Sequence, residues 1–425
     1  ERAEQEGEPL ASHLGFCADV LDRIRFDFRK TEEDVLAEIR EFMPDVTPQH
    51  LVQWREMNHL WFRFVDGQNW YFNRGVRNLL RLNAEVRKLR TISGKPTEFY
   101  VNHIADVIKA ASTSSTPYVL PTRLRISYQL TLKPGAVPPG EIVRCWLAYP
   151  IECNTQKDIK LIESFPEVKH TAAPNYPQRT LYFEQPASAS DEATVFKVVY
   201  EYTSLAQYQT VDPAKVVPYD VNSELFKTYT ASRDPHLVFT PEIVASAKEA
   251  VGDETNPYLM AKNIYDWVVT NITYTSMLEY STVPNLSAWS MKYRQGDCGV
   301  FGLLFIVMCR SVGVPARWQS GWSPEPGETD MHDWAEFYVE PYGWLHADPS
   351  RGVIDSPDPL IRDFHFGNFD CYRLVCNSDY GRPLDPPKRF PRSETVDFQR
   401  GEVEYSGNNL YYDKWSYSFE ATVVK

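Results

Sequence analysis

The chain has 425 residues and a mass of 49.1 kDa, a length that usually divides into roughly two to four domains. Hydrophobic residues make up 43% and charged residues 24%, which is typical of a globular protein and excludes a largely disordered chain. Aspartate and glutamate number 57 against 44 for lysine and arginine, so the formal net charge is −13. Because an acidic surface repels phosphate backbones and anionic lipid headgroups, nucleic acids and membrane surfaces are unfavourable partners.

Neither a membrane span nor a disulfide framework is expected. The longest nearly unbroken apolar stretch, residues 299–309, is about half as long as a helix needs to cross a bilayer. Seven cysteines are too few for a disulfide scaffold, and their odd number leaves at least one thiol free or paired with another chain. The chain starts at Glu1, not Met, with a polar stretch, which favours an exported bacterial protein, periplasmic or at the cell surface, over a cytoplasmic one.

The first region, residues 1–115, is predicted to be helical. Between residues 18 and 111, apolar residues recur at spacings of three and four and alternate with arginine and glutamate. Residues 61–72 break this period with an Asp-Gly pair between aromatic-rich flanks, which predicts a short β-hairpin. The histidines of this region show no spacing typical of a site, so we interpret the region as a packing or docking domain.

The second region, residues 116–234, is predicted to be an antiparallel, sandwich-like β domain. Its segments between residues 123 and 202 alternate or concentrate β-branched and aromatic residues, with Gly, Pro and Asn clusters between them. The pattern becomes helical again from Pro235, and the last 70 or so residues are strand-like with proline-rich connections. A third region, residues 235–425, is therefore expected to combine helices with a sheet that the C-terminal strands extend or cover, giving an α+β fold.

Several well-known motifs are absent from the sequence. It contains no GxGxxG, Walker A, HExxH, GxSxG or CxxC pattern. Nucleotide-binding, zincin, α/β-hydrolase and zinc-ribbon functions therefore lose their main support.

Cys298 is the strongest candidate nucleophile. It opens a nearly all-apolar stretch that ends near Gly313, which predicts a buried central helix. The unpaired N–H groups and the dipole at a helix N-terminus favour an anion and lower the pKa of a thiol. Asp297 acts against this effect because a neighbouring carboxylate raises the thiol pKa, and it is expected to cap the helix instead.

A base for this thiol is expected in a downstream β-hairpin. Residues 331–340 alternate as a strand, and residues 343–350 return after a Pro-Tyr-Gly turn. In an even register His332 and Asp348 lie on the same face of adjacent strands, where a carboxylate can hold one imidazole nitrogen while the other meets the thiol. His346 shares this face and is an alternative third member, and a slip of one residue would separate the pair.

The segments GDCGVFGLLFIVMCRSVGVPARWQSGW and MHDWAEFYVEPYGWLHADPS resemble the core of the transglutaminase-like superfamily of papain-type cysteine enzymes. The shared features are G-x-C at the start of a helix, an R-x-x-G-[IV]-P-A-R turn, an H-x-W strand and a G-W…D-P-[ST] strand. The whole chain also resembles bacterial multidomain members that place a helical region and a β domain before this core. The resemblance implies a papain-like core in which the cysteine helix packs on an antiparallel sheet.

By the same resemblance, Cys298 is the nucleophile, His332 the general base and acid, and Asp348 the residue that orients the imidazole. The implied reaction is acyl transfer at an amide bond of a peptide or protein substrate, with no metal or organic cofactor. The thiolate attacks the carbonyl, and either water or an amine resolves the thioester, as in peptidases and amidases or in transglutaminases. Gly299 follows the cysteine where eukaryotic transglutaminases usually have Trp, which favours the peptidase or amidase branch.

The resemblance also implies an oxyanion hole built from the Cys298 backbone N–H and one side-chain donor. Family members often draw that donor from the segment before the cysteine. Trp289, Tyr293 and Gln295 are the candidates in this chain, and Trp289 is preferred.

Three other interpretations stay open. The chain could be a catalytically inactive binding or scaffold module, although its triad is intact. Glycopeptide amidase activity is possible by analogy with the peptide N-glycanase branch, but the absence of CxxC pairs counts against it. A zinc site from Cys298, His332, His346 and Asp348 is disfavoured because only the last two form a close pair. The sequence does not indicate an oligomeric state.

Overall fold

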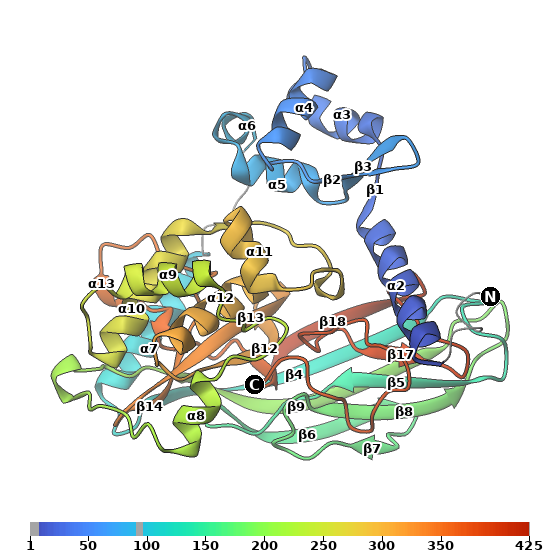
Figure 1. The fold of residues 1–425 in the computed structure, drawn as a ribbon. Coiled ribbons are helices and arrows are strands. Elements are labelled where there is room, and N and C mark those ends of the chain that lie inside the picture. Colours follow the sequence, from blue (N-terminus) through green and yellow to red (C-terminus); the bar gives the residue numbers. More distant parts are fainter. Residues whose placement is uncertain (1–7, 91–96, 425) are drawn as a thin grey trace. The chain divides into compact units, whose positions relative to one another are not determined.

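The structure, a computed structural model, describes residues 8–90 and 97–424. The chain forms two compact units, one from Glu1–Lys95 with Asn271–Asp297 and the other from Pro96–Thr270 with Cys298–Lys425 (Figure 1). The division expected from the sequence, with boundaries at residues 115/116 and 234/235, stays a prediction. Within the described ranges, no helix is long and apolar enough to span a membrane.

The first unit is mainly helical, with one small antiparallel sheet in the order β1-β3-β2. Its N-terminal elements are α2 (Glu8–Asp27), β1 (Phe28–Lys30), α3 (Glu32–Arg40), α4 (Pro48–Glu56), β2 (Phe62–Val65), β3 (Gln68–Phe72), α5 (Gly75–Leu82) and α6 (Ala84–Leu89). β2 and β3 pair around Asp66 and Gly67, whose φ angles of 51° and 78° suit a two-residue hairpin turn. The predicted hairpin inside a helical region is therefore confirmed.

A later segment of the chain returns to this first unit. It contains β10 (Thr273–Tyr274), η2 (Tyr280–Thr282), α11 (Leu286–Tyr293) and β11 (Gln295–Gly296). The Asn78 side chain exchanges two hydrogen bonds with the Ser276 backbone, at 2.9 and 2.8 Å, and Asp27 accepts one from the Glu279 N–H at 2.9 Å. Buried polar contacts of this kind fix the returning segment, and sequence periodicity does not reveal them.

The β domain of the second unit is a sandwich of two antiparallel sheets, in the orders β18-β4-β9-β6 and β17-β5-β8-β7 (Figure 1). Its strands are β4 (Tyr118–Leu132), β5 (Ile142–Ala148), β6 (Gln156–Phe165), β7 (His170–Thr171), β8 (Thr180–Pro186), β9 (Val195–Gln207), β17 (Glu402–Glu404) and β18 (Trp415–Val423). Side chains from both sheets, including Leu130, Val143, Phe183 and Val198, form one buried apolar core. The predicted antiparallel sandwich is confirmed.

The C-terminal strands differ from the expectation that they extend or cover the core sheet. β18 pairs with β4 from Trp415 opposite Leu132 to Val423 opposite Leu124, and β17 pairs with β5. By contrast, β16 (Leu374–Asn377) joins the core sheet, beside β12. An alternating pattern predicts a half-buried strand but not the strand with which it pairs, so the sequence could not assign these partners.

The papain-like core consists of helices packed on a five-stranded antiparallel sheet in the order β15-β14-β13-β12-β16. The remaining elements of the second unit are α7 (Glu98–Ser112), η1 (Pro213–Lys215), α8 (Glu224–Thr230), α9 (Pro241–Val251), α10 (Pro257–Asn271), α12 (Cys298–Ser311), β12 (Ala316–Glu325), β13 (Glu328–Val339), β14 (Gly343–Ala347), α13 (Pro359–Arg362) and β15 (Phe366–Gly367). α12 is buried from Cys298 to Arg310 and packs on β12 and β13. The predicted α+β fold with a buried cysteine helix is confirmed.

β12 and β16 approach each other closely at Gly321. This residue lies opposite His332 on β13, and a Cβ atom built on it would meet the Leu374 carbonyl oxygen at 1.8 Å. Glycine is therefore required for the two strands to pair beside the candidate site.

Replacing Gly321 with alanine is expected to lower the free energy of unfolding by about 1–3 kcal/mol, because the backbone must move to admit the methyl group. Urea denaturation of the purified variant measures this change. Gly302→Ala in α12 is the matched control, since its Cβ would lie 3.4 Å from the nearest atom, in the Trp318 ring. Equal stability of the Gly321→Ala variant and the unmodified protein would contradict the expectation.

Candidate active site

Cys298 is the first residue of α12, as predicted, and its side chain is only 9% exposed. Its Sγ lies 3.4 Å from Oδ2 of Asp333, the residue that follows His332 on β13. The helix N-terminus therefore places the thiol against the strand that carries the predicted base. The expected helix-capping role of Asp297 stays a prediction, and this residue accepts a hydrogen bond from the Tyr280 hydroxyl at 2.6 Å.

His332 and Asp348 are in direct contact, with 2.6 Å between Nε2 and Oδ2. The hairpin register pairs Glu336 with His346 and Ala335 with Ala347, so residues of even number share one face of β13 and β14. This is the register that the sequence analysis required. Nε2 faces Asp348, so Nδ1 is the imidazole nitrogen that this carboxylate does not bind.

The Asp348 carboxylate is surrounded by donors. Oδ1 accepts a hydrogen bond from the Ser350 hydroxyl at 2.9 Å, and Oδ2 accepts one from Arg373 at 3.0 Å. Arg351 adds a second positive charge, with its Nε 3.7 Å from Oδ2. Burial alone raises the pKa of this carboxyl, but His332 and the two guanidinium groups outweigh burial and hold the pKa well below its ordinary value.

Burial has the opposite consequence for the imidazole. Removal from water lowers the pKa of His332 below its ordinary value, and the charge of Asp348 offsets only part of this effect. At neutral pH the site therefore contains a neutral imidazole whose Nε2–H donates to an ionised Asp348. A neutral imidazole is the form that can accept a proton from a thiol.

Two arginines, the buried Arg373 and the partly exposed Arg351, lie beside this pair. Arg373 also donates from Nε to Asp370 Oδ2 at 2.8 Å, and the Tyr100 hydroxyl donates to the same oxygen at 2.9 Å. The Arg351 guanidinium lies 4.7 Å from the centre of the Tyr100 ring. Sequence reasoning missed this network, because its members come from separate segments and no spacing pattern links them to the hairpin.

The alternative third member, His346, lies beside the His332–Asp348 pair. Its ring stacks on Phe369 with centroids 3.9 Å apart, and burial lowers its pKa to about 4. It therefore remains a neutral packing residue at physiological pH. Among residues 8–90 and 97–424, no group of three or more His, Cys, Asp and Glu side chains has an arrangement that could hold a metal ion.

The structure places Trp289, the preferred oxyanion donor, in the first unit. Its ring packs edge-to-face on Trp61 and tilted against Tyr293, both with centroids 5.0 Å apart. It lines a pocket of about 140 Å³ within that unit. Because Cys298 belongs to the second unit, the oxyanion role of Trp289 stays a prediction.

Comparisons with known proteins identify the core. Residues 244–349 match the family model described as the transglutaminase-like superfamily. The uncharacterised protein YebA of Bacillus subtilis is 25% identical over 122 residues, which cover 24% of this chain and 16% of that protein. The peptide-N(4)-(N-acetyl-beta-glucosaminyl)asparagine amidase of Gallus gallus is 33% identical over 90 residues, or 21% of this chain and 12% of the relative.

Longer matches have lower identity. An uncharacterised Haemophilus influenzae protein is 22% identical over 191 residues, covering 37% of this chain and 51% of that protein. A crystal structure from Cytophaga hutchinsonii, described provisionally as a cysteine protease, matches 72% of this chain and 92% of its own with a TM-score of 0.49 and 16% identity. The chain thus spans about half or less of the length of these curated relatives.

The site and the family match together define the class of protein. The chain contains a core of the transglutaminase-like superfamily, at residues 244–349. At the level of that superfamily, the matches support catalysis by a cysteine.

Proposed function

We propose that this protein is a cysteine-dependent enzyme that transfers the acyl group of an amide bond in a peptide or protein substrate. Cys298 is the nucleophile, His332 is the general base and acid, and Asp348 orients the imidazole. The observation that carries the proposal is the 2.6 Å contact between His332 and Asp348. His332 lies on β13, and Cys298, the first residue of α12, contacts the same strand at Asp333. No metal or organic cofactor takes part in the proposed reaction.

In the proposed mechanism the Cys298 thiol gives its proton to Nδ1 of His332, and the thiolate attacks the amide carbonyl. The oxyanion that forms is stabilised by the Cys298 backbone N–H. The imidazolium then protonates the leaving nitrogen, the C–N bond breaks, and a thioester remains. His332 next removes a proton from water, which attacks the thioester and releases the carboxylic acid and the thiol.

Asp348 keeps its negative charge through every step. Its low pKa means that it receives no proton from the imidazolium, and it stabilises that cation by charge and by its hydrogen bond. An amine can replace water in the second half-reaction, which would give a transglutaminase. Of the two reactions, we prefer hydrolysis. The location of the protein, expected outside the cytoplasm of a bacterial cell, stays a prediction.

A second candidate activity is cleavage of a glycosylated asparagine side chain. Relatives from Gallus gallus, Oryza sativa and Drosophila melanogaster, each named as a peptide-N(4)-(N-acetyl-beta-glucosaminyl)asparagine amidase, are 33–38% identical over 65–90 residues. The same thiol and imidazole would serve, because that bond is also an amide. Parallel assays with a peptide mixture, an N-glycopeptide and a fluorescent primary amine separate hydrolysis, deglycosylation and transamidation.

The His332→Ala variant tests the proposal independently of the substrate. Iodoacetamide alkylation of Cys298 at pH 7 is expected to slow by about tenfold or more, because the thiol loses the base that accepts its proton. Peptide mass spectrometry at a series of pH values measures this rate. Cys309 in the same helix is an internal reference, since complete burial raises the pKa of its thiol well above the ordinary range.

The His346→Gln variant is the matched control, since this buried histidine shares the face of His332 but stacks on Phe369. It should leave the alkylation rate of Cys298 unchanged. If Cys298 reacts no faster than Cys309 in the unmodified protein, the enzyme proposal fails and a binding or scaffold module becomes the better interpretation.

A further inference from the structure

A second carboxylate, Asp333, contacts the candidate nucleophile. Its side chain is only 3% exposed, and each of its oxygens has a donor. Oδ2 lies 3.4 Å from Cys298 Sγ, and Oδ1 accepts a hydrogen bond from Nε2 of Gln399 at 2.8 Å. Gln399 also donates to the His332 carbonyl oxygen at 3.1 Å, so one amide group holds two consecutive residues of β13.

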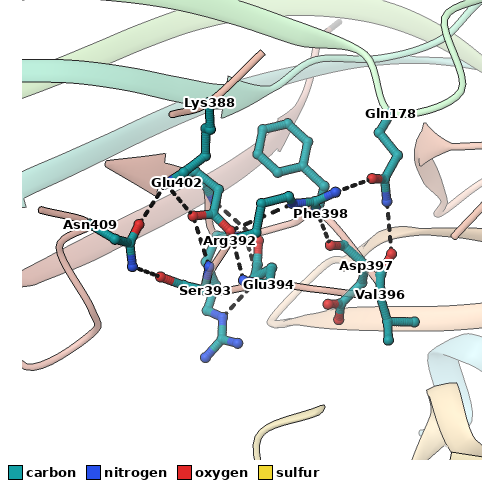
Figure 2. Close-up of polar contacts among 12 residues, drawn as sticks. Gln178, Lys388, Arg392, Ser393, Glu394, Val396, Asp397, Phe398, Glu402 and Asn409 are labelled. Atoms are coloured by element: carbon teal, nitrogen blue, oxygen red, sulfur yellow. Dashed lines mark hydrogen bonds and ion pairs between the residues drawn. The ribbon is translucent and has the colours of Figure 1, made fainter. Parts of the chain in front are cut away.

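The segment that carries Gln399 is held by buried glutamates. Glu394 Oε2 accepts hydrogen bonds from the backbone N–H of Gln399 at 2.9 Å and of Arg400 at 3.1 Å. Figure 2 shows Glu402, which is fully buried, between Lys388 at 2.8 Å and the Ser393 N–H at 3.0 Å. A connection without regular secondary structure is thus fixed by side-chain acceptors, and it presents Gln399 at a defined position.

A carboxylate beside a thiol affects its ionisation in a known direction. It accepts a hydrogen bond from the S–H group and repels a thiolate, so it favours the protonated form. The N-terminus of α12 and the base His332 act in the opposite direction. The balance between these influences determines how much thiolate exists before a substrate arrives.

We propose that Asp333, held in place by Gln399, is a positioning residue that orients the Cys298 side chain and keeps it as a thiol until substrate binds. This inference rests on the proposed function, because it assigns the resting state of the same nucleophile. In the reaction the proton passes from sulfur to Nδ1 of His332, and Asp333 stays ionised. The resting enzyme is thereby protected, since the thiolate is the form that alkylates and oxidises.

The Asp333→Asn variant tests the proposal, because it keeps the shape of the side chain and removes its charge. The apparent pKa of Cys298 is read from alkylation rates over about two pH units on either side of neutrality. It should fall by about one unit, giving about tenfold faster alkylation at low pH. The exposed Asp330 on the same strand supplies the matched control, Asp330→Asn, which should not shift the profile. The other ionisable groups that bear on the thiol, namely the adjacent Asp297 and the pair His332 and Asp348, are the same in both variants.

A second variant covers the case in which Asp333→Asn does not fold. Gln399→Leu leaves every charge in place but releases the carboxylate, so the apparent pKa of Cys298 should fall by a smaller amount. Circular dichroism and thermal unfolding establish that each variant is folded. A purely structural role for these residues would change the unfolding temperature without moving the alkylation profile.

The two proposals fail in different ways. If neither Asp333→Asn nor Gln399→Leu lowers the apparent pKa while His332→Ala still slows alkylation, the positioning role is overturned and the proposed function stands. If His332→Ala has no effect and no substrate is turned over, the proposed function fails whatever Asp333 does.

Discussion

Replacing Cys298 with alanine should abolish turnover, with kcat/KM for a peptide substrate falling by about 10⁴-fold or more. The side chain supplies the atom that forms the thioester, and no neighbouring group can take over that bond. The fold should persist, because the change removes one sulfur atom at the start of a helix whose remaining side chains are unaltered. Hydrolysis of a peptide mixture, followed by mass spectrometry, measures the loss once a cleaved substrate is known.

The matched control for this experiment is Cys309→Ala, eleven residues further along α12. That thiol is completely buried, so its removal is expected to lower stability slightly and leave kcat/KM unchanged. Turnover that survives Cys298→Ala would show that the observed activity does not depend on this thiol. Loss of turnover in both variants would point to damage to the helix and would require a comparison of their unfolding curves.

The predictable part of the candidate site is the part that lies in a short hairpin. His332 and Asp348 are separated by one tight turn, so the alternation of strand side chains and the length of the connection fix their relative positions. The N-terminal position of Cys298 follows from the apolar helix that it begins. These features depend on neighbours in the sequence, and local pattern therefore suffices to predict them.

The contacts that tune the site are non-local and could not be predicted in this way. Gln399 reaches Asp333 from 66 residues further along the chain, and Arg373 reaches Asp348 from 25 residues further along. A single buried glutamine or arginine in an irregular segment has no periodicity that indicates its partner. Only the folded chain shows that Arg373 contacts Asp348 and that Gln399 contacts Asp333.

The fold shows the same distinction between elements and their partners. The hairpin of β2 and β3 and the strands of the sandwich follow from turn residues and alternation. The return of residues 271–297 to the first unit depends on contacts such as that of Asn78 with Ser276. Assigning the C-terminal strands β17 and β18 to the sandwich likewise requires a packing surface more than 200 residues earlier in the chain.

The largest effect on stability is expected from Arg373, whose side chain is 2% exposed and binds Asp348 and Asp370 at 3.0 and 2.8 Å. Arg373→Met should lower the free energy of unfolding of the second unit by about 3–5 kcal/mol, because two buried carboxylates lose their shared cation. It should also reduce turnover, since the pKa of Asp348 would rise and its hold on His332 would weaken. Urea denaturation at pH 7, followed by tryptophan fluorescence, measures the stability change.

The pH dependence of this effect identifies its cause. Burial raises the pKa values of Asp348 and Asp370, but the positive charges beside them have the larger effect and hold both pKa values below the ordinary value of 3.8. The ionised carboxylates therefore stabilise the folded protein above that pH, and this stabilisation is lost as the pH falls through their native pKa values. The stability gap between the unmodified protein and Arg373→Met should therefore be widest near neutrality and narrow as acid protonates the unpaired carboxylates of the variant. Adding Asp370→Asn to Arg373→Met should recover part of the loss. The control Arg382→Met removes the pair between the exposed Arg382 and the partly buried Asp379, which keeps its contact with Arg233, and should cost no more than about 1 kcal/mol. A gap that is constant with pH, or no recovery in the double variant, would mean that Arg373 stabilises the core through packing and not through its charge.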